Sequence, residues 1–146
     1  MKATQANLFS LLDGRKQLVI PIYQRTYSWT PKQCQQLWND ILQLSADETI
    51  PAHFIGSMVY IEKGIYQSTA VSQLLVIDGQ QRLVTISLLL AALGKAIEDT
   101  NIQSDITRKK INNYYLFNNE EEGDQRYKII LTQSDKETYI RLIEDR

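Results

Sequence analysis

Five consecutive residues, Asp78 to Arg82 (Asp-Gly-Gln-Gln-Arg), bring a carboxylate, two amides and a guanidinium together. They follow the apolar run Leu74–Ile77, which predicts a buried strand, and they lead into an apolar stretch that predicts a helix. The first N–H groups of a helix lack partners and carry partial positive charge, so anions bind there. Gly79 allows a tight turn or the close approach of a ligand. The sequence therefore predicts an anion site in which Arg82 binds phosphate and Asp78 positions water or a divalent metal ion.

A plainer interpretation of this segment stays open. Asp78 can serve only as a helix cap, and Arg82 only as a surface cation. A cation in the first helical turn opposes the helix dipole, at a cost of roughly a few tenths of a kcal/mol unless an anion lies nearby. That cost slightly favours the anion site.

A second segment combines aromatic rings with hydrogen-bonding groups. Tyr23, Tyr27 and Trp29 alternate with Gln24 and Arg25 just before a predicted helix. Aromatic faces, a guanidinium and an amide suit a nucleobase and its phosphate. Alternatively, the aromatic side chains close the edge of the core beside that helix.

A third segment, Phe54–Glu62, is rich in β-forming residues and predicts a strand. Gly56 and Ser57 inside it indicate either a bulge or the close approach of another group to the backbone. Ser57 lacks the Gly-x-Ser-x-Gly frame of a hydrolase nucleophile. His53, the single histidine, has no nucleophile near it in the sequence and is expected to be structural or exposed.

Other patterns supply the elements that must position these segments. They predict four helices: one from a Thr4 cap through Leu12, one opened by Thr30, Pro31 and Gln33 with Leu37, Trp38, Ile41 and Leu44 on its apolar face, one around Ile106–Phe117, and one opened by a Ser134–Glu137 capping box. They also predict strands at Gln17–Ile22 and Arg126–Leu131, and a polar loop or hairpin at 63–72. Gly94 is expected to end the helix that follows Arg82. The last helix has no closing residue before Arg146, so we expect the chain to be a fragment of a longer protein.

Composition excludes several classes of protein. The chain has 146 residues, 43% of them hydrophobic, and 16 basic against 17 acidic residues give a net charge of 16 − 17 = −1. It is too apolar for a disordered chain, and with one cysteine it forms no internal disulfide. The first 16 residues lack the unbroken apolar region of a signal peptide, and the run Leu83–Leu93 is too short to span a bilayer. We therefore expect a cytoplasmic protein that does not interact with membranes.

Taken in this order, the three segments resemble the GmrSD restriction endonuclease N-terminal domain family. The resemblance rests on Ile-Pro-x-Tyr-Gln-Arg-x-Tyr-x-Trp at 20–29, Phe-Ile-Gly-Ser-x-Val at 54–59 and Ile-Asp-Gly-Gln-Gln-Arg-Leu-x-Thr at 77–85. Residues 127–140 are also similar to the family's strand, Thr-x-x-Asp and helix pattern.

The resemblance implies an α+β fold of the ParB/sulfiredoxin-like group, with a small mixed sheet flanked by helices in one domain over residues 1–146. It implies nucleotide binding, and often nucleotide hydrolysis, in prokaryotic defence against phage or foreign DNA. The helical and nuclease regions that usually follow are absent from this chain, so we do not expect it to cleave DNA.

The residue patterns and the resemblance together predict one pocket, in which Arg25 and Arg82 neutralise a nucleoside triphosphate. Asp78, Gln81 and Arg82 are the expected catalytic residues, and Asp78 is the expected ligand of Mg²⁺. The residues expected to bind the nucleotide are Tyr23, Gln24, Arg25, Tyr27, Gly56, Ser57, Gly79 and Gln80.

Two other functions stay open. In the first, the domain senses modified DNA and Tyr23 or Trp29 forms an apolar wall, although a net charge of −1 is unfavourable for duplex binding. In the second, the domain is an inactive structural regulator that binds partner chains. The sequence is compatible with an oligomer for each of these two functions and for nucleotide binding.

Overall fold

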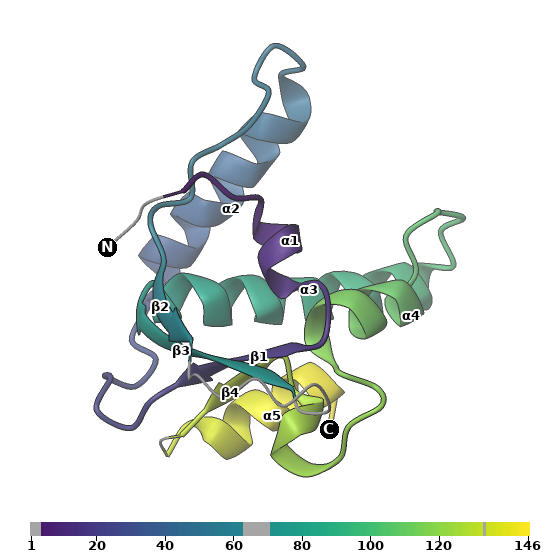
Figure 1. The fold of residues 1–146 in the computed structure, drawn as a ribbon. Helices are drawn as coiled ribbons and strands as arrows, with labels where there is room; N and C mark the ends of the chain where they lie inside the picture. Colours follow the sequence, from purple (N-terminus) through teal and green to yellow (C-terminus); the bar gives the residue numbers. More distant parts are fainter. Residues whose placement is uncertain (1–3, 63–70, 133) are drawn as a thin grey trace.

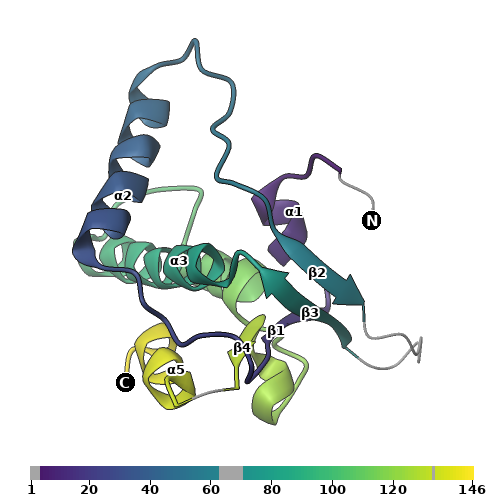
Figure 2. The ribbon, with the colours of Figure 1, turned by 90° about the vertical axis from the view of Figure 1, so that its left-hand side faces the viewer.

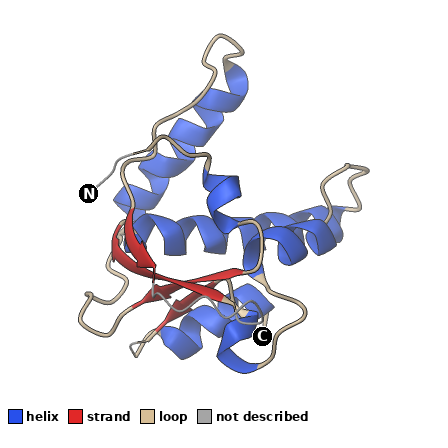
Figure 3. Ribbon diagram, viewed as in Figure 1, coloured by secondary structure: helices blue, strands red, loops and turns tan. Residues whose placement is uncertain are grey.

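Four strands of this α+β chain form one mixed sheet in the order β2-β3-β1-β4 (Figure 3). The computed structural model describes residues 4–62, 71–132 and 134–146. Within these residues the elements are α1 (Leu8–Leu12), β1 (Lys16–Ile20), α2 (Pro31–Ala46), β2 (Val59–Glu62), β3 (Ser72–Asp78), α3 (Gln80–Thr100), α4 (Arg108–Ile111), the π-helical turn η1 (Asn112–Leu116), the 3₁₀ turn η2 (Gly123–Arg126), β4 (Ile129–Leu131) and α5 (Lys136–Glu144). The mixed α+β class expected from the sequence is confirmed.

Strands β3 and β1 are the interior strands of the sheet. β1 pairs in parallel with both β3 and β4, whereas β2 pairs antiparallel with β3. Pro21 follows the last residue of β1, so its missing N–H removes no bond from the sheet. The carboxyl ends of β1 and β3 therefore lie at the same edge of the sheet.

The core lies between the sheet and helices α3 and α5, which contact each other and β4 (Figure 1). Leu18, Val76 and Leu83 are among its fully buried side chains. The Tyr139 hydroxyl donates to Ser87 Oγ across the α3–α5 contact at 3.0 Å. Burial raises the pKa of Tyr139, so the phenol stays protonated at neutral pH and keeps this bond.

Helix α2 projects away from the sheet in both ribbon views (Figures 1 and 2). It begins as predicted, because Pro31 occupies its first position and the Thr30 N–H donates to Gln33 Oε1 at 2.9 Å. Its apolar face is largely uncovered: Leu37 is buried, but Trp38 is 44% exposed. The spacing of apolar residues predicted the helix correctly, and only part of its apolar face is buried.

Three predicted helix ends are wrong. Asn7, rather than Thr4, caps α1, since its Oδ1 accepts the Phe9 N–H at 2.9 Å. Gly94 lies buried inside α3, where an added Cβ would be 3.2 Å from Arg108 Cγ, so this glycine makes room for α4 instead of ending the helix. Helix α5 stops at Glu144, because Asp145 adopts the left-handed conformation with φ +60°.

Three predicted strands are shorter in the structure. The strand predicted at Gln17–Ile22 is β1, which ends at Ile20, before Pro21. Residues 54–58 are irregular because Gly56 has φ +105°, and only Val59–Glu62 pairs with β3. Arg126 belongs to η2, so β4 begins at Ile129. Most of the predicted polar loop, residues 63–70, lies outside the described residues.

The helix predicted around residues 106–117 is present as α4 followed by η1. The predicted capping box of α5 is absent, and Asp135 stands at the N-cap position without a side-chain cap bond. Arg108 in α4 pairs with Glu98 of α3 at 2.5 Å. No helix among the described residues has both the length and the apolar character needed to cross a membrane.

Candidate functional site: an anion pocket at the carboxyl edge of the sheet

The parallel pairing of β1 with β3 brings two sequence motifs together. β1 ends at Ile20 and β3 ends at Asp78, and both ends lie at one edge of the sheet. The segment after β1 and the turn after β3 therefore leave the sheet side by side. In open sheets with parallel strands, ligands commonly bind outside this carboxyl edge.

An open pocket of about 440 Å³ lies at this edge. Its lining consists of Gln24, Arg25 and Trp29 from the motif at 20–29 and of residues 78–82 from the motif at 77–85. The two segments therefore face each other across one pocket, as the sequence predicted. The first turn of α3, a helix of 21 residues, begins in the wall of this pocket.

Three amide side chains, of which Gln80 and Gln81 are buried, join the two motifs. Gln81 is 6% exposed; its Oε1 accepts the Ser28 N–H at 2.8 Å and its Nε2 donates to the Thr26 carbonyl at 3.1 Å. Gln24 Nε2 donates to the Ile77 carbonyl at 2.9 Å, and Gln80 Nε2 donates to Gln24 Oε1 at 3.2 Å. These amides fix the position of the loop between β1 and α2 relative to α3.

The motif at 54–59 positions the side chain of Arg82. The guanidinium of Arg82 lies against Gly56, where an added Cβ would be 2.5 Å from Cζ, and Nη1 donates to the Ser57 carbonyl at 3.3 Å. Gly79 has φ +92°, and a Cβ there would be 2.6 Å from Met58 Cγ. Both glycines therefore let residues 56–58 pack tightly against the turn that carries Arg82.

The charge of the pocket is positive. Among the described residues, neither Arg25 nor Arg82 forms an ion pair, whereas most other arginines pair with a carboxylate. Asp78 is the one acidic residue in the lining, and its Oδ1 accepts the Gly79 N–H at 2.8 Å. Two cations and the N-terminus of a long helix surround one carboxylate, which favours an anionic ligand.

The described residues of the pocket offer few protein ligands to a metal ion. No group of three or more His, Cys, Asp or Glu side chains converges in the part of the chain that the structure describes. Mg²⁺ is commonly held by one or two carboxylates together with substrate phosphates. Asp78 fits that role only when a bound phosphate supplies the remaining ligands.

The aromatic residues of the motif at 20–29 point in different directions in the structure. Trp29 lines the pocket, whereas Tyr23 is 67% exposed and is not part of the lining. The Tyr27 ring points the other way, with its hydroxyl 2.9 Å from Thr85 Oγ1 and 3.5 Å from Cys34 Sγ. Burial raises the pKa of Tyr27. Trp29 is thus the aromatic residue placed to contact a ligand in this pocket.

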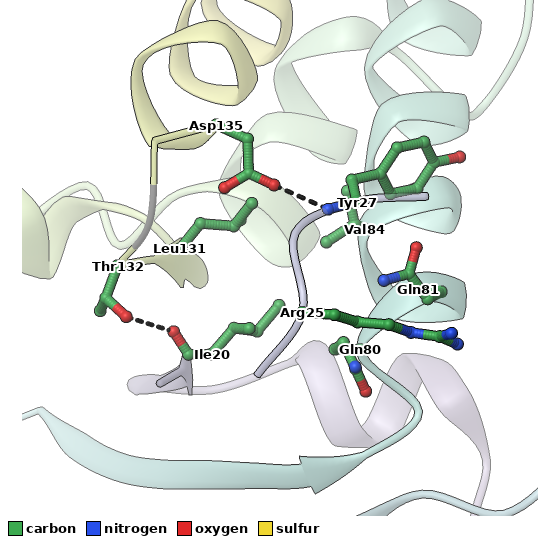
Figure 4. Close-up of a pocket in the computed structure, with 9 residues that line it drawn as sticks. All are labelled: Ile20, Arg25, Tyr27, Gln80, Gln81, Val84, Leu131, Thr132 and Asp135. Carbon is green, nitrogen blue, oxygen red and sulfur yellow. Dashed lines mark hydrogen bonds between the residues drawn. The ribbon is translucent and has the colours of Figure 1, made fainter. Parts of the chain in front are cut away.

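A second, much narrower cavity of about 10 Å³ adjoins the pocket and shares Arg25, Gln80 and Gln81 with it (Figure 4). Its far wall contains Thr132 and Asp135, which sequence reasoning did not assign to the site. Their Thr-x-x-Asp spacing was visible in the sequence, but only the parallel pairing of β4 with β1 brings it to this edge.

Replacing Gln81 by alanine is expected to destabilise the fold by roughly 1–3 kcal/mol, because two backbone groups lose their partners. Urea unfolding measures this loss. Gln36→Ala, on an exposed position of α2, is the matched control and should change stability by less than about 0.5 kcal/mol. Equal stability of the two variants would contradict the positioning role of Gln81.

The fold and site together define an α+β domain with a positively charged pocket at the carboxyl edge of its sheet. The chain matches the GmrSD restriction endonuclease N-terminal domain family over residues 8–146. Because this match covers nearly the whole chain, the chain belongs to that family, as the resemblance predicted, and is a domain of a restriction-system protein. Comparison with curated proteins gives no match.

Proposed function

We propose that this domain binds a nucleoside triphosphate in the pocket at the carboxyl edge, and that the restriction protein hydrolyses it there. The observation that carries the proposal is the pair of arginines, Arg25 and Arg82, which line one pocket at the N-terminus of α3 without an ion-pair partner among the described residues. A guanidinium binds phosphate oxygens through two parallel hydrogen bonds, so two of them suit a triphosphate.

Each lining residue then has a role set by its contacts. Arg25 and Arg82 bind phosphate oxygens, the first-turn N–H groups of α3 bind a third phosphate position, and Trp29 stacks on the base. Mg²⁺, when bound with the nucleotide at Asp78, would neutralise phosphate charge. Asp78 Oδ2 can also orient the attacking water. Gln81 is expected to act by holding the loop, since both ends of its amide are bonded to backbone.

This proposal includes the cellular setting. The domain would work in the cytoplasm against phage or other foreign DNA, within the ParB/sulfiredoxin-like group of folds. Recognition of modified DNA and its cleavage would belong to other regions of the protein. The family membership supports this setting, and the positively charged pocket supports a nucleotide as the ligand.

A thermal-shift screen with ATP, GTP, CTP and UTP, each with and without Mg²⁺, tests the proposal. A ligand at about 100 times its dissociation constant adds about 2.7 kcal/mol of stability, which should raise Tm by about 5–10 °C. The double variant Arg25→Ala/Arg82→Ala should show no shift.

Other outcomes of the screen would contradict the proposal. Equal shifts in the wild type and in the double variant would place the nucleotide elsewhere. Salt-sensitive binding of modified DNA with no response to nucleotides would favour a DNA-sensing module. An intact fold that responds to neither would favour a structural regulator.

A further inference from the structure

Asp135 connects the β4–α5 side of the domain to the loop that carries Arg25. It stands at the N-cap position of α5, yet its side chain makes no cap bond to that helix. Instead, Oδ2 accepts the Tyr27 N–H at 2.9 Å (Figure 4). Tyr27 is two residues beyond Arg25, so this bond holds the loop close to the arginine.

The other oxygen of Asp135 is enclosed. Oδ1 is buried and has no hydrogen-bond donor among the described residues. Asp135 lines the narrow cavity of about 10 Å³, which has room for about one water molecule. A carboxylate in such a place is unfavourable for folding, and a neutral Asn or Ser would cap α5 at less cost. Stability alone therefore does not account for Asp135.

The loop that carries Arg25 is held from two sides. Gln81 bonds to the backbone of Thr26 and Ser28 from the α3 side, and Asp135 bonds to the intervening Tyr27 from the α5 side. Figure 4 shows the Arg25 side chain directed away from Asp135 and toward Gln80 and Gln81. Hydrogen bonds thus fix the backbone at three successive residues, 26–28. Arg25 lies directly before them and forms part of the wall of the larger pocket.

We propose that Asp135 is a positioning residue of the triphosphate pocket, which acts through Arg25 by fixing the backbone at Tyr27. This inference rests on the proposed function. Loss of the Asp135 acceptor would let the loop move, and Arg25 would reach the phosphates in only a fraction of molecules. The site would thus depend on the β4–α5 connection as well as on α3.

A double-mutant cycle with Arg25 tests the inference, with calorimetric titration of inorganic triphosphate into the purified chain as the measurement. Arg25→Ala should weaken binding roughly tenfold or more, and Asp135→Ala roughly fivefold. Because Asp135 acts through Arg25, the double variant should bind no more weakly than Arg25→Ala. Asp135→Asn keeps an oxygen acceptor for the Tyr27 N–H and should bind within about twofold of the wild type.

Hydrogen exchange at the Tyr27 amide provides a readout that needs no ligand. Exchange should be faster in Asp135→Ala and unchanged in Asp135→Asn. The control Asp105→Ala removes an exposed carboxylate elsewhere and should alter neither exchange nor affinity. Additive losses in the double variant, or equal Tyr27 exchange in Asp135→Ala and the wild type, would overturn the inference. A wild-type chain that binds neither triphosphate nor nucleotides would overturn the proposed function itself.

Discussion

Replacing Arg82 by alanine is expected to weaken nucleoside triphosphate binding by roughly ten- to a hundredfold. The lost bond is charge-assisted, worth roughly 1.5–3 kcal/mol, and each 1.4 kcal/mol is about a tenfold change in affinity. The fold should be little affected, because the side chain is partly exposed and its one side-chain bond within the described residues reaches the Ser57 carbonyl at 3.3 Å. Calorimetric titration with the nucleotide that gives the largest thermal shift measures the loss.

Two further variants make the Arg82 result specific. Arg82→Lys keeps the charge but loses the planar fork, so its affinity should lie between those of the wild type and the alanine variant. Arg141→Ala removes an exposed arginine from α5 and should bind as the wild type does. If the Arg141 variant lost as much affinity as the Arg82 variant, net charge rather than a defined contact would explain binding.

Replacing Gly56 by alanine is expected to reduce binding about as strongly as removal of the Arg82 side chain. The new Cβ would stand 2.5 Å from Arg82 Cζ, so the guanidinium must leave its place. The backbone at Gly56 also has φ +105°, which an L-residue adopts at a cost of roughly 1–2 kcal/mol. Titration and urea unfolding together should show both losses.

The chain contains a matched control for this substitution. Gly123 also has a positive φ, +58°, but nothing lies within 4 Å of an added Cβ. Gly123→Ala should therefore lose stability through backbone strain alone and bind nucleotide normally. A Gly56→Ala variant that is destabilised yet binds like the wild type would show that the position of Arg82 does not matter for the ligand.

The sequence predicted the local features of this site well. The apolar run before Asp78, the polar turn and the apolar helix after it are enough to predict a strand, a turn and a helix N-terminus. Thr30, Pro31 and Gln33 likewise predict the start of α2 from neighbouring residues alone. Such features depend on contacts within a few residues, which a sequence contains directly.

Features that depend on distant parts of the chain were missed or misassigned. Glycine commonly ends a helix. At Gly94, however, α4 packs against the residue and the helix α3 continues. Gln81 is expected from the sequence to be catalytic, and only the structure shows that both ends of its amide bond to the loop between β1 and α2. Asp135 reaches the site only because β4 pairs with β1, more than 100 residues earlier in the chain. Periodicity and spacing contain no information about such pairings.

The central claim is that Arg25, Arg82 and the first turn of α3 form a triphosphate site. The most direct measurement is a nucleotide titration followed by the backbone amide resonances of the ¹⁵N-labelled chain of 146 residues. Saturable shifts are predicted for the amides of residues 80–82 and of the loop at 24–29, and they should disappear in Arg25→Ala/Arg82→Ala. Absence of shifts at residues 80–82 while nucleotide binds, or shifts confined to another face of the domain, would contradict the claim.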